Sequence, residues 1–100
     1  MDIKVKWSPE AIEDVESIAQ YIARDSQFYA QSTVSKIIDF SRSVAKFPKM
    51  GRIVPEFNDQ KIRERLVYSY RLVYKIEHGY ILIVAVIHGK QLFGAIAERF

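Results

Sequence analysis

The hydrophobic residues of this chain change their spacing once, near residue 50, from the period of helices to the period of strands. Before that point apolar side chains recur every three or four residues, as at Ala11, Val15, Ile18 and Ile22, which is the pattern of an amphipathic helix. After it come three runs rich in Ile, Val, Leu and Tyr, at residues 62–68, 70–76 and 80–88, a composition typical of strands. The sequence therefore predicts helices followed by a sheet, which is the α+β class.

Local signals divide the chain into one strand, two helices and three further strands. Residues 3–7 alternate apolar and polar side chains and predict a short strand. Ser8 and Ser26 each precede a helical pattern and can cap a helix start, whereas the proline and glycine of residues 47–51 end the second helix. We expect a two-helix antiparallel hairpin on one face of a twisted, mostly antiparallel sheet. Residues 77–79 are expected to form the hairpin turn between the last two strands. The other sheet face is expected to be uncovered.

Length and composition limit the class of protein. One hundred residues are expected to form a single domain, 1–100, because two halves would each be too small to bury a core. The longest apolar run, residues 81–87, is too short to span a bilayer, and the N-terminus lacks the apolar core of a signal peptide. The absence of cysteine excludes disulfides and thiol nucleophiles. We expect a soluble, cytoplasmic protein.

Metal and cofactor chemistry has little support in the sequence. The two histidines, His78 and His88, lie far apart, and carboxylates do not cluster after the first predicted helix, so no metal site is expected. The chain contains neither a glycine-rich phosphate loop nor a Gly-x-Ser-x-Gly elbow. We therefore expect no cofactor.

Positive charge is concentrated in the second half of the chain. The net charge is +3, and the second half carries eight basic residues: Arg52, Lys61, Arg63, Arg65, Arg71, Lys75, Lys90 and Arg99. This excess is compatible either with a solvated surface of mixed sign or with an anionic partner.

The strand period suggests where a basic patch can form. In residues 70–76 the period of two places Tyr70, Leu72, Tyr74 and Ile76 against the helices and Arg71, Val73 and Lys75 on the solvated face. If Arg63, Arg65, Arg71 and Lys75 share that face, they form a patch that can hold phosphates or an acidic peptide. The competing interpretation is an ordinary charged strand surface.

Two further features leave a functional and a structural interpretation open. His88, at the end of an apolar strand, can serve as a general acid or base, or it can simply hydrogen-bond the backbone in a turn where Gly89 supplies an unusual dihedral angle. The apolar tail around Phe93 and Phe100 either docks on its own domain or needs a partner. Tyr70 and Tyr74 are expected to fill the core rather than to stack on nucleic acid.

Five motifs in order resemble the RelE/ParE superfamily of type II toxins, over about residues 3–92. They are Trp7-Ser8-Pro9-Glu10-Ala11 before a helix with Tyr21-Ile22, Phe47-Pro48-x-x-Gly51-Arg52-x-x-Pro55-Glu56, Ile62-Arg63-Glu64, residues 70–76, and Val86-Ile87-His88-Gly89-Lys90. The resemblance implies the same fold and a toxin that is neutralised by a tightly bound, acidic and partly disordered antitoxin. A homodimer or a heterotetramer with the antitoxin is a further implied assembly.

The superfamily implies two activities, and the long helical hairpin and the His-Gly-Lys strand end favour the ParE-like one. ParE-like members inhibit DNA gyrase and have no recognised catalytic set. RelE-like members cut mRNA on the ribosome, and the candidate catalytic residues here would be Arg52, Arg63, Arg65, Arg71, Lys75 and His88. Binding candidates are Arg63, Arg65, Arg71, Lys75, His88, Lys90 and Phe93. Against the nuclease, only Phe93 and Phe100 are aromatic after Lys90, so the C-terminal tyrosine of the best-known RelE-like members is missing. A third interpretation is a non-toxic module that only binds an antitoxin.

Overall fold

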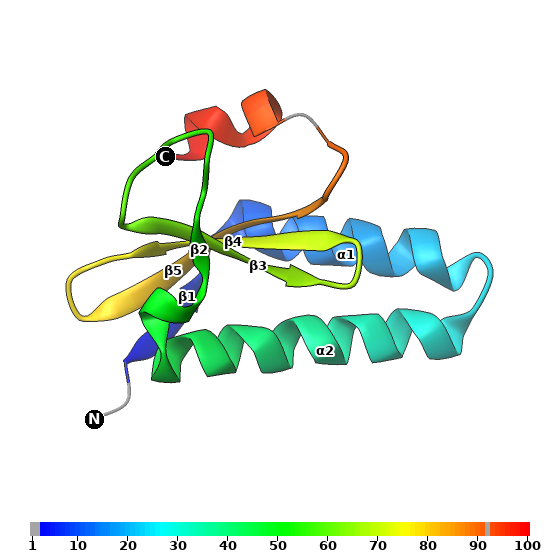
Figure 1. The fold of residues 1–100 in the computed structure, drawn as a ribbon. Coiled ribbons are helices and arrows are strands. Elements are labelled where there is room, and N and C mark those ends of the chain that lie inside the picture. Colours follow the sequence, from blue (N-terminus) through cyan, green and yellow to red (C-terminus); the bar gives the residue numbers. More distant parts are fainter. Residues whose placement is uncertain (1–2, 92) are drawn as a thin grey trace.

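The α+β architecture predicted from the sequence is confirmed by the computed structural model, which describes residues 3–91 and 93–100 (Figure 1). The elements in chain order are β1 (Lys4–Trp7), α1 (Pro9–Ala23), α2 (Gln27–Lys46), the short 3-10 helix η1 (Pro48–Met50), β2 (Arg52–Ile53), β3 (Ile62–Val67), β4 (Tyr70–Ile76), β5 (Tyr80–His88) and the 3-10 helix η2 (Phe93–Arg99). Within the described residues no helix is both long and apolar enough to cross a membrane.

Both long helices begin at the serines that the sequence singles out. The Ser8 hydroxyl accepts a hydrogen bond from the Ala11 N–H at 3.1 Å, and the Ser26 hydroxyl accepts one from the Tyr29 N–H at 3.1 Å. Such caps satisfy N–H groups that have no partner within the helix. Helix α2 ends at Lys46, directly before Phe47 and Pro48, because proline disfavours helical geometry at the residue before it.

The five strands form one sheet in the order β1-β5-β4-β3-β2. β1 pairs with β5 in parallel, and the other neighbours are antiparallel. The turn before β5 has Gly79 at φ +89°, a conformation that glycine tolerates. The two-residue strand β2 was not predicted, since Arg52 and Ile53 are too few to show a period. A register shift between Val73 and Tyr74 marks a β-bulge, which bends the sheet locally.

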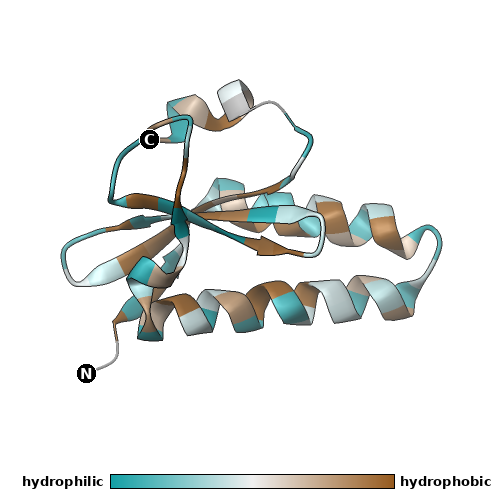
Figure 2. Ribbon diagram, in the orientation of Figure 1, coloured by the Kyte–Doolittle hydropathy of each residue, from teal (hydrophilic) through white to brown (hydrophobic). Residues whose placement is uncertain are grey.

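The main core lies between the helical hairpin and one face of the sheet. Its buried residues include Ile37 from α2, Leu72 and Tyr74 from β4, and Ile81 and Ile83 from β5. The prediction that Leu72 and Tyr74 face the helices is therefore confirmed, and Tyr70 packs against the same cluster. Hydrophobic and hydrophilic residues are mixed along both long helices (Figure 2), as expected for helices that bury one face and expose the other.

The expectation that the second sheet face is uncovered is wrong. The chain after β2 and the C-terminal helix η2 cross this face, on the side opposite to α1 and α2 (Figure 1). A second buried cluster forms there from Val54, Ile62, Val73, Ala85, Ile87 and Ile96, with Phe57 and Phe100 packed against it. Phe57 and Phe100 meet edge to face, 4.7 Å between ring centroids. The apolar tail thus docks on its own chain, because its apolar side chains cover apolar residues of β4 and β5.

Candidate functional site

A chain of four charged side chains crosses the second face of the sheet. Glu64 on β3 has a fully buried side chain and accepts hydrogen bonds from Arg52 Nε at 2.6 Å and from Arg71 Nε at 2.5 Å. The Arg71 guanidinium also donates to both oxygens of Glu56, at 3.1 and 2.9 Å. These bonds connect β2, β3 and β4 with the loop after β2, and we refer to Arg52, Glu64, Arg71 and Glu56 as the ion-pair chain.

The ion-pair chain neutralises Arg71, which the sequence places on a solvated face. Arg71 is only 7% exposed. The hydrogen bonds that Arg71 donates to Glu56, followed by the one it donates to Glu64, raise the pKa of the Arg71 guanidinium further above its ordinary value, and the hydrogen bond from Arg71 lowers the pKa of Glu56. The prediction of a solvated Arg71 is wrong, because η2 and the loop after β2 bury that face. An incoming anion would have to displace Glu56 to reach this guanidinium.

Arg63 and Arg65 do not share a face with Arg71 and Lys75. In the sheet Arg63 lies opposite Tyr74 and Arg65 opposite Leu72, and directly paired residues project to the same side. Arg65 donates to the Ser43 hydroxyl on α2 at 2.7 Å. The four-residue basic patch considered in the sequence analysis is therefore not formed, and Arg63 and Arg65 lie on the helix face instead.

The remaining predicted site residues are spread over the molecule. Lys75 forms an ion pair with Glu77, 3.3 Å between Nζ and Oε1. Lys90 is exposed in the turn after β5. Phe93 is the first residue of η2, and its side chain lies outside the described part of the structure. Within the described contacts, neither Lys75 nor Lys90 joins Arg71 in a cluster of cations.

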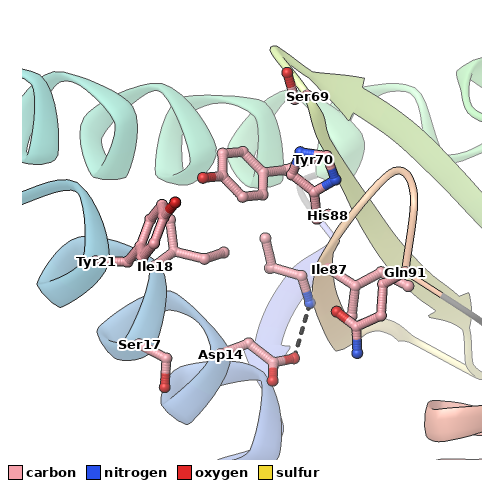
Figure 3. Close-up of a pocket in the computed structure, with 10 residues that line it drawn as sticks. Asp14, Ser17, Ile18, Tyr21, Ser69, Tyr70, Ile87, His88 and Gln91 are labelled. Carbon is pink, nitrogen blue, oxygen red and sulfur yellow. Dashed lines mark hydrogen bonds between the residues drawn. The ribbon is translucent and has the colours of Figure 1, made fainter.

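His88 lines a cleft of about 510 Å³ between α1 and the ends of β4 and β5 (Figure 3). Tyr21 approaches from α1, and the Tyr70 ring meets the imidazole edge to face at 5.7 Å between centroids. His88 Nδ1 accepts a hydrogen bond from the Lys90 N–H at 3.1 Å, so the neutral ring carries its proton on Nε2. This contact confirms the interpretation of His88 as a residue that hydrogen-bonds the backbone in a turn. The predicted unusual dihedral angle at Gly89 is wrong, because the φ of Gly89 is not positive.

A carboxylate that the sequence analysis missed forms the floor of this cleft. Asp14 on α1 accepts from the Val86 N–H at 3.0 Å (Figure 3) and from the Arg99 guanidinium at 2.6 and 3.2 Å. Asp14 lies in the first predicted helix, and 85 residues separate it from Arg99. No local pattern connects the two residues. Their contact anchors η2 to the first helix.

A protein-family model matches most of this chain. The family model described as "ParE toxin of type II toxin-antitoxin system, parDE" matches residues 5–93. A comparison with curated protein sequences gives no match.

Solved structures from three bacteria share the fold. One is from a chromosomal ParDE toxin-antitoxin system of P. aeruginosa, with a TM-score of 0.71 and 16% identity over 86% of this chain and 95% of that chain. The RelBE2 toxin-antitoxin complex of Mycobacterium tuberculosis has a TM-score of 0.64 and 17% identity over 88% of this chain and 99% of that chain. A YoeB dimer of Staphylococcus aureus has a TM-score of 0.60 and 20% identity over 88% of this chain and 98% of that chain. At these identities the similarity shows the fold. Since the family match spans most of its length, the chain belongs to the ParE toxin family of type II toxin-antitoxin systems.

Proposed function

We propose that this ParE-like toxin stops growth by binding DNA gyrase in the cytoplasm and that it does not cleave RNA. The observation that carries the proposal is the state of Arg71. A nuclease needs cations that are free to stabilise the charge developing on a phosphate, and Arg71 is instead buried and bound by Glu56 and Glu64.

The positions of the other cations support the same conclusion. Arg63 and Arg65 lie on the helix face of the sheet, whereas Arg71 and Lys75 lie on the opposite face. One phosphodiester cannot contact both faces of a sheet, since side chains on opposite faces point apart. The candidate catalytic set is therefore divided, and a mechanism based on binding requires no convergence of these residues.

We further propose that an antitoxin neutralises the protein. The similar P. aeruginosa and M. tuberculosis structures are from toxin-antitoxin systems, and one similar S. aureus structure is a YoeB-YefM complex. The basic second half of this chain favours an acidic partner. A homodimer or a heterotetramer with the antitoxin is the expected assembly, and light scattering of the purified complex measures it.

Two parallel assays of the purified toxin test the target. We expect inhibition of gyrase-catalysed DNA supercoiling and intact mRNA on translating ribosomes. His88→Ala should reduce gyrase inhibition only slightly, because one exposed binding contact contributes about 1 kcal/mol. Ribosome-bound mRNA that is cut at A-site-phased positions would contradict the proposal.

One observation favours the RelE-like alternative, an mRNA endonuclease. The exposed His88 shares its cleft with the hydroxyls of Tyr21 and Tyr70, and a neutral imidazole with a proton on Nε2 can donate it to a leaving group. In that case His88→Ala would reduce mRNA cleavage by about a hundredfold or more. The same variant therefore separates binding from catalysis.

A further inference from the structure

An exposed apolar surface lies where α2 ends. Phe47 is 59% and Met50 58% exposed, and with Pro48 and the half-buried Ile76 they line an open cavity of about 590 Å³. We refer to Phe47, Pro48, Met50 and Ile76 as the η1 patch, since Pro48 and Met50 lie on η1 and Phe47 directly precedes it; η1 is the short green turn between α2 and β2 in Figure 1. Ile76 also packs against the main core, so the patch continues the core to the surface.

Hydrogen bonds from two side chains of the sheet fix the backbone of the turn that presents the η1 patch. The Tyr74 hydroxyl donates to the Pro48 carbonyl at 2.5 Å and accepts from the Gly51 N–H at 3.1 Å. Arg63 donates to the carbonyls of Lys49 and Gly51 at 3.1 and 2.9 Å. A backbone that is fixed before binding loses little conformational entropy when a partner docks, which favours an interface anchor at this turn.

The chain segment that carries Phe47, Pro48 and Met50 has charges of one sign, whereas Ile76 lies between Lys75 and Glu77, which pair with each other. From residue 40 to residue 55 the sequence contains four cations, Arg42, Lys46, Lys49 and Arg52, and no acidic residue. Lys46 and Lys49 are exposed and line the cavity with the apolar side chains. Arg52 is paired with Glu64. A ligand that fits this surface must combine apolar anchors with negative charge.

We propose that the η1 patch binds an acidic segment of the antitoxin, with apolar side chains seated against Phe47, Met50 and Ile76 and carboxylates facing Lys46 and Lys49. The proposal rests on the antitoxin partner of the proposed function and adds the surface that it uses. Such segments order on binding, and apolar anchors supply most of their affinity. A nucleic-acid backbone suits the lysines but brings no aliphatic anchor for Met50 and Ile76, so the protein partner fits better.

Paired variants of the full chain test the proposal. Lys49→Glu reverses one charge beside the patch, and the matched control is Lys36→Glu, an exposed lysine on α2 that lines a different cavity. Lys36 and Lys46 are ten helical residues apart, about 15 Å. Met50→Ser removes one anchor, and its control is Leu66→Ser, because Leu66 is also 58% exposed. Lys49 is preferred to Lys46, since the charge of Lys46 also stabilises the C-terminus of α2.

The probe is the antitoxin encoded next to the toxin gene, and the measurement is its dissociation constant by calorimetry. We expect Lys49→Glu and Met50→Ser each to weaken binding by about tenfold or more, with both controls within about twofold. Circular dichroism of each variant excludes misfolding. Unchanged affinity in both test variants overturns this inference alone, while the absence of any complex overturns the antitoxin partner as well. Lost binding to a fluorescent single-stranded RNA or DNA oligonucleotide with unchanged antitoxin affinity would assign the patch to nucleic acid and also overturn it.

Discussion

Replacing Glu64 by glutamine removes the central charge of the ion-pair chain without changing the size of the side chain. One carboxylate oxygen of Glu64 accepts from Arg52 and the other from Arg71. Glutamine keeps one acceptor, but its NH₂ group points a donor at an arginine that is itself only a donor. The buried Arg71 guanidinium then has Glu56 as the carboxylate that remains among its described ion pairs.

The magnitude follows from the burial of each partner. Breaking a buried ion pair costs about 3–5 kcal/mol when the remaining charge is left uncompensated. Glu56 still contacts Arg71 but its side chain is 42% exposed, and the Arg52 side chain is 60% exposed, so solvent screens part of the loss. We therefore expect a loss of about 3 kcal/mol in the free energy of unfolding, a large part of the stability of a small domain.

Thermal unfolding followed by circular dichroism measures this loss. In a domain of this length about 3 kcal/mol corresponds to a decrease in Tm of about 10 °C or more. Arg52→Gln is the control, because it leaves Arg71 and Glu64 paired and should cost about 1 kcal/mol or less. A Glu64→Gln protein that melts within about 2 °C of the unmodified chain would refute the argument that a buried ion pair secures this face.

The main core, the ion-pair chain and the η1 turn can each be tested by one further substitution. Leu72→Ala should cost about 2–5 kcal/mol of unfolding free energy in urea titration, since Leu72 is fully buried in the main core; an unchanged midpoint would mean that the strand faces are inverted. Because the folded-state pKa of Glu56 is lowered by Arg71, its contribution to stability is present above the ordinary pKa of 4.5 and lost as pH falls below it; Glu56→Gln should flatten that part of a stability curve measured against pH. Gly51→Ala would place a Cβ 2.3 Å from the Tyr74 hydroxyl, so we expect a lower Tm and a displaced η1 turn, and an unchanged Tm would contradict this.

The helices and the long strands could be predicted from local patterns. Ser8 and Ser26 cap the helices at the predicted positions, and β4 and β5 have the predicted bounds. These elements are encoded by contacts between residues close in sequence, such as a hydroxyl three residues before an N–H group. The two-residue β2 and the helix η2 lack such signals, and their positions depend on the sheet against which they pack.

The candidate site depends on contacts between residues far apart in the sequence. A period of two correctly separated Leu72 and Tyr74 from Arg71 and Val73, but it does not tell which face of a strand reaches solvent. That was decided by η2 and the loop after β2, which cover Val73 and place Glu56 on Arg71. Likewise the alternation of Arg63, Glu64 and Arg65 is plain in the sequence, whereas pairing with β4 decides that Glu64 meets Arg71 and that the two arginines face the helices. The sequence by itself determined the elements and their alternating faces; the register and the covering of those faces are long-range contacts, and only the tertiary structure decided which cations are free to act.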